Sequence, residues 1–369
     1  MVPLKGQSLT WLIALFLLSV AGAVQAGERT PIKAIYIPVA DHYAGIVAYE
    51  KYRNEMQYAD YQIERMKSWP LLRAYFETGE VDLAFVMGPL AMDMFLEQEN
   101  FRWVGLMHRD GNALAINDKL NVDVRLHLDR SRRKPDPAVA KALVKAKEET
   151  GRPVLVGVPH LKATHTVVLY KYLKEQNLRL GLDSSAATDV MAIQVAPLKS
   201  PSFLRKNNGR GIGAAFEQSL PWADVVETQG YGHVAWYSKD VLIWPPYGHV
   251  ECIIVATDAA IASKRKAVHE VIDYIHRAGQ DLEEARSKSG PAMEAISKMI
   301  RHHIPEHNEE AIAQSLRTDL NVINYRHLNV DKAGLRQIMD LAVEGGIIKE
   351  PINIDDFADD TFASRIKQQ

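Results

Sequence analysis

The sequence lacks the features that mark several large classes of protein. Its single cysteine, Cys252, excludes a disulfide within the chain and lies in an apolar run, which predicts a small buried residue. The formal net charge of -2 at pH 7 gives no overall basic field for nucleic acid. Gly-x-Ser-x-Gly, P-loop and dinucleotide-binding fingerprints are also absent. These absences disfavour a disulfide-rich domain, a nucleic-acid-binding protein and a classical enzyme.

One long apolar run is present, at the N-terminus. Lys5 is the only charged residue before Glu28, residues 9–24 are mostly apolar, and Val24-Gln25-Ala26 offers small residues for cleavage. This pattern predicts a cleavable signal peptide over residues 1–26. The run is short for a membrane span, which needs roughly 20 residues, so an uncleaved anchor is the weaker alternative. No cysteine follows the cleavage site for lipid attachment, and the sequence therefore predicts a periplasmic protein of a Gram-negative cell.

Beyond this segment, strand and helix patterns alternate. The first region predicts strands at 32–39, 61–65, 81–87 and 103–107, with helices at 43–56, 68–79 and 88–96. A second region predicts helices at 136–150 and 164–173 and strands at 153–158 and 190–195. A strand at 253–256 and helices at 259–287, 291–302, 308–317 and 332–344 follow. Such alternation predicts an α/β fold with parallel βαβ units, and 369 residues predict about two domains.

The loops after the early strands are candidate ligand sites. In open parallel sheets, ligands bind beyond the carboxyl ends of the strands, where helices begin. Three loops have this position, at 40–43, 67–69 and 87–90. The candidate ligand-binding residues in these loops are Asp41, His42, Tyr43, Trp69, Gly88 and Pro89.

Other segments have a structural or a functional interpretation. The basic residues 130–134 lack interleaved aromatic residues and predict a solvated loop. His303 and His307 are spaced for a metal on one helix face, but Pro305 interrupts that helix, so we expect no metal there. The stretch from Trp244 to His249 predicts either a structural turn or a loop of the ligand cleft. His165 follows Thr164 in a first helical turn, where a donor can meet an oxyanion.

Several segments together resemble one family, the periplasmic nitrate/sulfonate/bicarbonate-binding proteins of ABC importers, with the nitrate- and bicarbonate-binding branch closest. The resemblance runs from about residue 32 to residue 360. It is carried by Tyr36 to Tyr43, Ser68-Trp69-Pro70, Thr78 to Ala84, Met87 to Met92, Asp110 to Ala115, Thr164-His165 with Tyr172-Leu173, Pro221-Trp222, and Ser238 to Asp240 leading to Ile243-Trp244-Pro245.

The resemblance implies a type II periplasmic-binding fold, in which two α/β lobes share a hinge and a central cleft. It implies a first lobe over 27–116, a second lobe over 117–249, and a return to the first lobe over 250–369. The chain is then expected to cross between the lobes near residues 116 and 250.

The resemblance also implies site residues, position by position. Trp69 matches a tryptophan that lines the anion site, His165 matches the histidine of a Thr-His motif, and Asn112 stands where the nitrate binders usually have glutamine. A cation is expected among Arg205, Lys206 and Arg210, although the aspartate that follows it in the family is missing here. Leu220 replaces the glutamate of a Glu-Pro-Trp motif, which leaves the identity of the ligand open.

The expected function is that of a solute-binding protein of an ABC importer, without enzymatic activity. It would bind a small anion such as nitrate, bicarbonate or a sulfonate, and deliver it to a membrane permease. The expected binding residues comprise the loop residues above together with Asn112, His165, Lys206, Arg210 and Trp244. The alternatives are a binder of a pyrimidine or another heterocycle, stacked on Trp69, Tyr43 and Trp244, and a sensor for a membrane kinase. No cofactor, metal ion or nucleic acid is expected.

Overall fold

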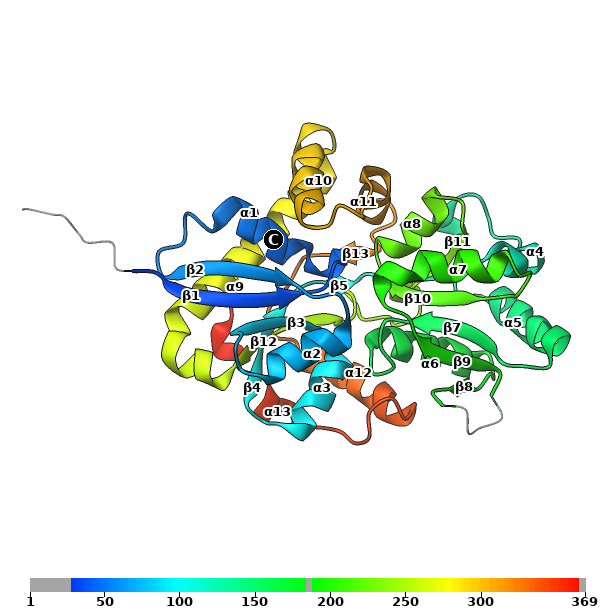
Figure 1. Cartoon of the computed structure of the whole chain (residues 1–369), viewed down its shortest axis with the longest axis horizontal. Coiled ribbons are helices and arrows are strands. Elements are labelled where there is room, and N and C mark those ends of the chain that lie inside the picture. The colour runs from blue at the N-terminus through cyan, green and yellow to red at the C-terminus, as the bar shows by residue number, and fades with distance from the viewer. Residues whose placement is uncertain (1–27, 184–187, 365–369) are drawn as a thin grey trace, which may run out of the picture.

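The computed structural model describes residues 28–183 and 188–364, which form two α/β lobes placed side by side (Figure 1). The predicted signal peptide, residues 1–26, lies outside this range. Within the described ranges, no helix combines the length and the apolar character that a membrane span requires.

The first lobe is built on a five-stranded mixed sheet. Its strand order is β2 (Ala59–Arg65), β1 (Thr30–Tyr36), β3 (Leu83–Met87), β12 (Cys252–Thr257) and β4 (Phe101–Leu106). Helices α1 (Tyr43–Tyr52) and α9 (Asp258–Lys288) lie on one face, while α2 (Trp69–Glu77) and α3 (Gly88–Glu97) lie on the other (Figure 1). All five residues of β3 are buried, as expected for a strand covered on both faces. The predicted strands and helices of this region are confirmed to within a few residues.

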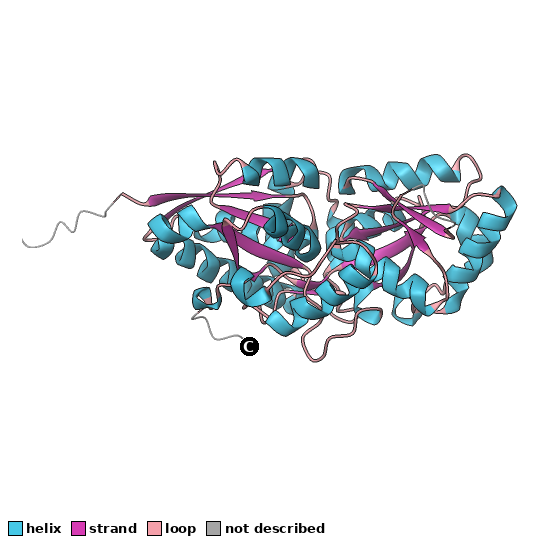
Figure 2. Ribbon diagram, turned by 90° about the horizontal axis from the view of Figure 1, so that it is seen from below, coloured by secondary structure: helices cyan, strands magenta, loops and turns pink. Residues whose placement is uncertain are grey.

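The second lobe has a six-stranded sheet. Its order is β11 (His233–Tyr237), β6 (Asn112–Ile116), β10 (Ala215–Ser219), β7 (Val154–Val158), β9 (Val190–Gln194) and β8 (Leu180–Gly181). The surrounding helices are α4 (Asp118–Val124), α5 (Pro137–Thr150), α6 (Thr164–Glu175), α7 (Ser200–Asn208) and α8 (Trp222–Thr228). Figure 2 shows helices around both sheets.

The crossings between the lobes differ from the expected plan. Strand β6 belongs to the second sheet, so the chain leaves the first lobe before Asn112 rather than near residue 116. It returns between β11 and β12, close to the expected residue 250. Strands β6 and β12, which follow the crossings, run antiparallel to their neighbours, whereas the alternating pattern predicted parallel units alone. The short strands β5 (Arg109–Asp110) and β13 (Ile323–Asn324) pair beside the crossings.

The C-terminal helices connect the two lobes. They are α10 (Pro291–His303), α11 (Glu309–Ser315), α12 (Lys332–Glu344) and α13 (Ile354–Phe357). Helix α11 packs against α8 of the second lobe, and α12 contacts both α3 and α6. The tail therefore contacts both lobes.

The basic segment 130–134 is only in part the solvated loop that its composition predicts, because Arg130 and Arg133 are buried while the other three residues are exposed. Arg130, in the short 3-10 helix Arg130–Arg132, is 8% exposed and pairs with the buried carboxylate of Asp224. Arg133 is 6% exposed and pairs with Glu227 at 2.8 Å. Since the carboxylates come from α8, almost a hundred residues later, the local sequence gave no sign of these partners.

Candidate functional site

A cluster of polar side chains lies where the two lobes meet. Asp41 follows β1, His108 follows β4, and Glu251 precedes β12, so all three extend from the first sheet. The second lobe contributes the first residue of β6, the first turn of α6 and the last residue of β10. The members of this interlobe cluster are Asp41, His108, Asn112, His165, Ser219, Glu251 and Cys252, and every one of them has 0% exposure.

Direct bonds join the two lobes within and beside this cluster. The Ser219 hydroxyl donates to Asp41 Oδ2 at 2.7 Å, and the Asn112 amide lies 3.5 Å from Glu251 Oε1. Beside them, the backbone N–H of Ala40 donates to Leu220 at 2.7 Å, and the Trp222 indole donates to Pro38 at 2.9 Å. The structure therefore describes a closed arrangement, in which hydrogen bonds join the facing surfaces of the two lobes.

His108 carries positive charge in this arrangement. Burial would lower the pKa of its imidazole, but the Asp41 and Glu251 carboxylates outweigh burial and raise it to about 10. Its Nε2 lies 3.1 Å from Glu251 Oε2 and 3.6 Å from Asp41 Oδ2. Burial opposes ionisation of Glu251, yet the hydrogen bond and the charge of His108 lower its pKa below the usual range. One imidazolium thus stands between two carboxylates.

Hydrogen-bond acceptors outnumber donors in the cluster. Ser219 has one hydroxyl proton, and since it donates this proton to Asp41, His165 Nε2 at 2.8 Å must donate to Ser219. Burial lowers the pKa of His165, so its ring is neutral and Nδ1 is an acceptor, 3.5 Å from Glu251 Oε1. Asp41 Oδ1 has no hydrogen-bond partner in the described chain. Such a site favours a ligand that brings positive charge or hydrogen-bond donors.

The cluster has no lysine or arginine. Each ion pair that Asp41 or Glu251 makes with a described residue is with a histidine. Glu217, on β10, is also fully buried, and burial together with Glu251 raises the pKa of its carboxyl well above the usual range. The Glu217 carboxyl is therefore neutral, and the negative charge of the cluster comes from Asp41 and Glu251, which favours a cation over an anion.

The other predicted residues of the first lobe lie around the cluster. His42 is adjacent to Asp41, but its ring contacts Trp69 edge-on and its Nδ1 bonds the Ile37 backbone; burial lowers its pKa to about 4. The Tyr43 hydroxyl bonds His307 Nδ1 at 2.9 Å, away from the cluster. Gly88, followed by Pro89 in α3, donates its N–H to the Glu251 carbonyl and so supports that residue's backbone. His42 and Gly88 therefore support the backbone around Asp41 and Glu251 from within the first lobe.

Lys206 and Arg210, the expected cations, lie at the other end of the second lobe. Helix α7 begins at the interlobe edge and runs away from it, and its nine residues span about 13 Å. Both side chains are exposed. Ile212, two residues after Arg210, accepts a hydrogen bond from the Asn117 amide beyond the C-terminal end of β6. Arg205 is also exposed and covers the ring of Tyr231. Arg205 and Lys206 lie in the last turn of α7, and Arg210 lies two residues beyond the end of that helix.

Trp244 is likewise outside the cluster. Its indole donates to Asp331 at the start of α12 at 3.1 Å, and a shallow hollow separates it from Arg109 and His327. The stretch 244–249 is thus a turn beside the crossing segments, which agrees with the structural alternative for this motif.

Two central residues were absent from the expected site. His108 and Glu251 are 143 positions apart in the chain and meet only because β4 and β12 are neighbours. Their local signal is weak: each is a single ionisable residue bordering an apolar strand. Ser219 had no signal at all beyond its position before Leu220 and Pro221.

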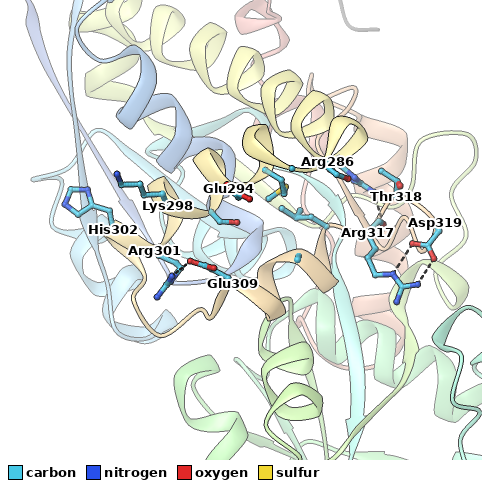
Figure 3. A pocket seen from close by; sticks show the side chains of 15 residues that line it. Arg286, Glu294, Lys298, Arg301, His302, Glu309, Arg317, Thr318 and Asp319 are labelled. Carbon is cyan, nitrogen blue, oxygen red and sulfur yellow. Dashed lines mark hydrogen bonds and ion pairs between the residues drawn. The ribbon is translucent and has the colours of Figure 1, made fainter.

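A hollow larger than the one at Trp244 lies outside the interlobe cluster, beside α10 and α11. Figure 3 shows this hollow of about 1160 Å³, in which Arg317 pairs with Asp319, and Arg301 with Glu309. It contains none of the predicted site residues. Nearby, His302 and His303 contact Glu50, while His307 is fully buried against Tyr43. His303 and His307 thus have different partners, and helix α10 ends at His303, before Pro305.

The chain belongs to the NMT1-like family, whose model matches residues 25–297. No curated protein sequence matches it significantly. The family and the neighbours below support the resemblance noted in the sequence.

Solved structures share the fold. The periplasmic nitrate-binding protein of Synechocystis PCC 6803 is 15% identical with a TM-score of 0.70, covering 92% of this chain and 86% of its own. A zinc-bound ligand-binding component of an ABC-type import system from Staphylococcus aureus is 18% identical, with a TM-score of 0.67 and coverage of 90% and 98%. The alkanesulfonate-binding protein of Xanthomonas axonopodis pv. citri, bound to MOPS, is 10% identical, with a TM-score of 0.63 and coverage of 90% and 98%. At these identities the comparison shows that the chain has the periplasmic-binding-protein fold.

Proposed function

We propose that the protein is the periplasmic solute-binding component of an ABC importer, and that it binds its ligand at the interlobe cluster without transforming it. The observation that carries this proposal is a fully buried set of ionisable side chains contributed by both lobes. Burying ionisable groups costs free energy, and buried clusters of such groups are typical of binding sites. The N-terminal signal pattern supports export to the periplasm.

The proposed mechanism is a hinged trap. Ligand enters between open lobes, contacts groups on both, and stabilises the closed state. The Ser219–Asp41 and Trp222–Pro38 bonds form only on closure, because each joins one lobe to the other. The closed surface would then dock on a membrane permease.

The cluster favours a cation, or a ligand rich in hydrogen-bond donors, over the anion expected from the family. Asp41 and Glu251 would repel nitrate, bicarbonate or a sulfonate, and the expected cations lie at the far end of the second lobe. Stacking of a heterocycle is also less favoured, since Trp244 lies outside the cluster and Trp69 contacts His42.

We therefore expect titration calorimetry with nitrate, bicarbonate and taurine to show no binding at millimolar concentrations. Removing Lys206 and Arg210 together by alanine substitution should leave this result and the melting temperature unchanged. In parallel, protein isolated from the periplasm should carry about one bound ligand per chain, identified by mass spectrometry and elemental analysis after denaturation.

Submillimolar binding of any of the three anions would contradict the ligand class. A chain that carries no ligand from any preparation, or that converts the compound it holds, would contradict the binding function itself.

A further inference from the structure

The structure assigns a metal-binding role to the interlobe cluster: we infer that Asp41, His108 and Glu251 bind a divalent transition-metal ion of the zinc type, with Cys252 at the fourth position. This inference rests on the proposed function and specifies the ligand class of the same site. It differs from the sequence expectation, which considered a metal only at His303 and His307.

The donor atoms already surround one point. Asp41, His108, Glu251 and Cys252 each offer one ligand atom, and the four atoms lie within 4.8 Å of one another. All four side chains have 0% exposure, so the packing of the surrounding protein fixes their positions. Imidazole nitrogen, carboxylate oxygen and cysteine sulfur together form a donor set that suits zinc and its neighbours in the transition series.

Three separations among the four ligand atoms are close to the edges of a coordination tetrahedron. With zinc bonds of about 2.0–2.1 Å to nitrogen and oxygen, neighbouring ligand atoms lie about 3.3–3.4 Å apart, and a sulfur bonded at about 2.3 Å lies about 3.5 Å from an oxygen. Here His108 Nε2 is 3.1 Å from Glu251 Oε2 and 3.6 Å from Asp41 Oδ2, and Cys252 Sγ is 3.7 Å from Asp41 Oδ2. An ion can therefore enter with only small movements of the side chains.

The charges also favour a cation. Two carboxylates in a solvent-free site repel each other, and a divalent ion between them neutralises both. Metal binding replaces the proton on His108 Nε2 and that on Cys252 Sγ, and both protons leave to solvent. A metal ion needs little room, which fits a cluster whose members lie within hydrogen-bonding distance of one another in the closed arrangement.

Neighbouring groups support the ligands from both lobes. Ser219 bonds Asp41 Oδ2, and Asn112 and His165 lie 3.5 Å from Glu251 Oε1. Outer-shell bonds of this kind orient metal ligands. Since these three residues belong to the second lobe, metal affinity depends on closure, as a solute trap requires.

The test uses the full chain, stripped with a chelator and titrated with zinc chloride. We expect one tight ion per chain, and a loss of affinity of about 100-fold or more in Glu251→Gln and in Asp41→Asn. Both replacements keep the side-chain size, and circular dichroism of each establishes that it is folded. The matched control is the double variant His302→Ala/His303→Ala, which removes the two histidines beside Glu50 and should leave the tight site intact.

The absorption spectrum of cobalt-loaded protein tests whether Cys252 is the fourth ligand. Cobalt-loaded protein should show strong visible bands of tetrahedral geometry and a near-ultraviolet sulfur-to-cobalt band, and Cys252→Ser should lose only the latter. If the tight site survives in Glu251→Gln and Asp41→Asn, or disappears in the His302/His303 variant, the assignment is overturned.

The outcomes also separate this inference from the proposed function. If zinc and cobalt fail to bind but the periplasmic protein carries an organic solute, the metal site is wrong and the solute-binding function stands. If neither metal nor solute is ever found, both are wrong.

Discussion

Replacing Arg130 with alanine is expected to lower the free energy of unfolding by about 3–5 kcal/mol. Arg130 lies in the second lobe with 8% exposure and pairs with Asp224, which is 1% exposed; it also lies 3.3 Å from Glu227. Without the guanidinium, the Asp224 carboxylate keeps the cost of burial and loses the charge that offsets it. Urea unfolding at neutral pH measures the loss.

The matched control is Arg132→Ala, in the same short helix but with an exposed side chain. It is expected to change stability by no more than about 0.5 kcal/mol. A double variant, Arg130→Met with Asp224→Leu, removes both charges and should recover most of the loss. Equal losses in Arg130→Ala and Arg132→Ala would show that the buried pair has no special role.

The stability of the Arg130→Ala variant should also depend on pH in a defined direction. Burial raises the pKa of Asp224 to about 6 even though Arg130 lowers it, so without Arg130 the pKa rises further. Between that value and the ordinary aspartate pKa of about 4, the folded chain holds a proton that the unfolded chain has lost. Lowering the pH through this range therefore favours the folded state and recovers part of the lost stability. A variant whose stability falls over the same range would contradict this account.

Arg130 also shows where sequence reasoning stops. Hydrophobic periodicity located most helices and strands, because periodicity is local and the buried faces of α2 and β3 follow it. A run of arginines looks solvated when its partners are distant in sequence, and Asp224 is 94 residues away. Charges buried by pairing across the fold are not visible in the local pattern.

The candidate site shows the same limit. The rule that ligands bind at the carboxyl ends of strands predicted Asp41, and the resemblance added Asn112 and His165; all three are in the cluster. His108 and Glu251 were missed because strand neighbourhood, not sequence spacing, brings them together. The charge of the site was also missed, since the expected cations are exposed residues at or just beyond the C-terminal end of α7.

A second large loss of stability is expected for Gly248→Ala, in the segment between β11 and β12 where the chain returns to the first lobe. Gly248 has φ +94, where side chains are strained, and an added Cβ would lie 2.1 Å from Asp110 Oδ2. Asp110 in turn accepts the N–H of His249 at 2.9 Å, so the two crossing segments are packed against each other here. We expect a loss of about 3 kcal/mol in the free energy of unfolding, measured by urea titration.

Two controls separate the contact from the backbone strain. Gly211→Ala also has positive φ, at +62, but an added Cβ meets nothing within 4 Å, so it should cost only about 1 kcal/mol. In an Asp110→Ala background, where the clashing carboxylate is gone, Gly248→Ala should cost less than it does alone. Additive losses in the double variant would show that the contact with Asp110 is not the cause.

Gly248→Ala should also weaken ligand binding, although Gly248 does not belong to the interlobe cluster. Asp110 lies between His108 and Asn112 in the first crossing, so displacing it moves two cluster residues at once. Each 1.4 kcal/mol removed from the closed state lowers the affinity about tenfold, and zinc titration of Gly248→Ala against Gly211→Ala measures this difference. An unchanged affinity in a destabilised Gly248→Ala protein would mean that the crossings hold the lobes together without setting the geometry of the site.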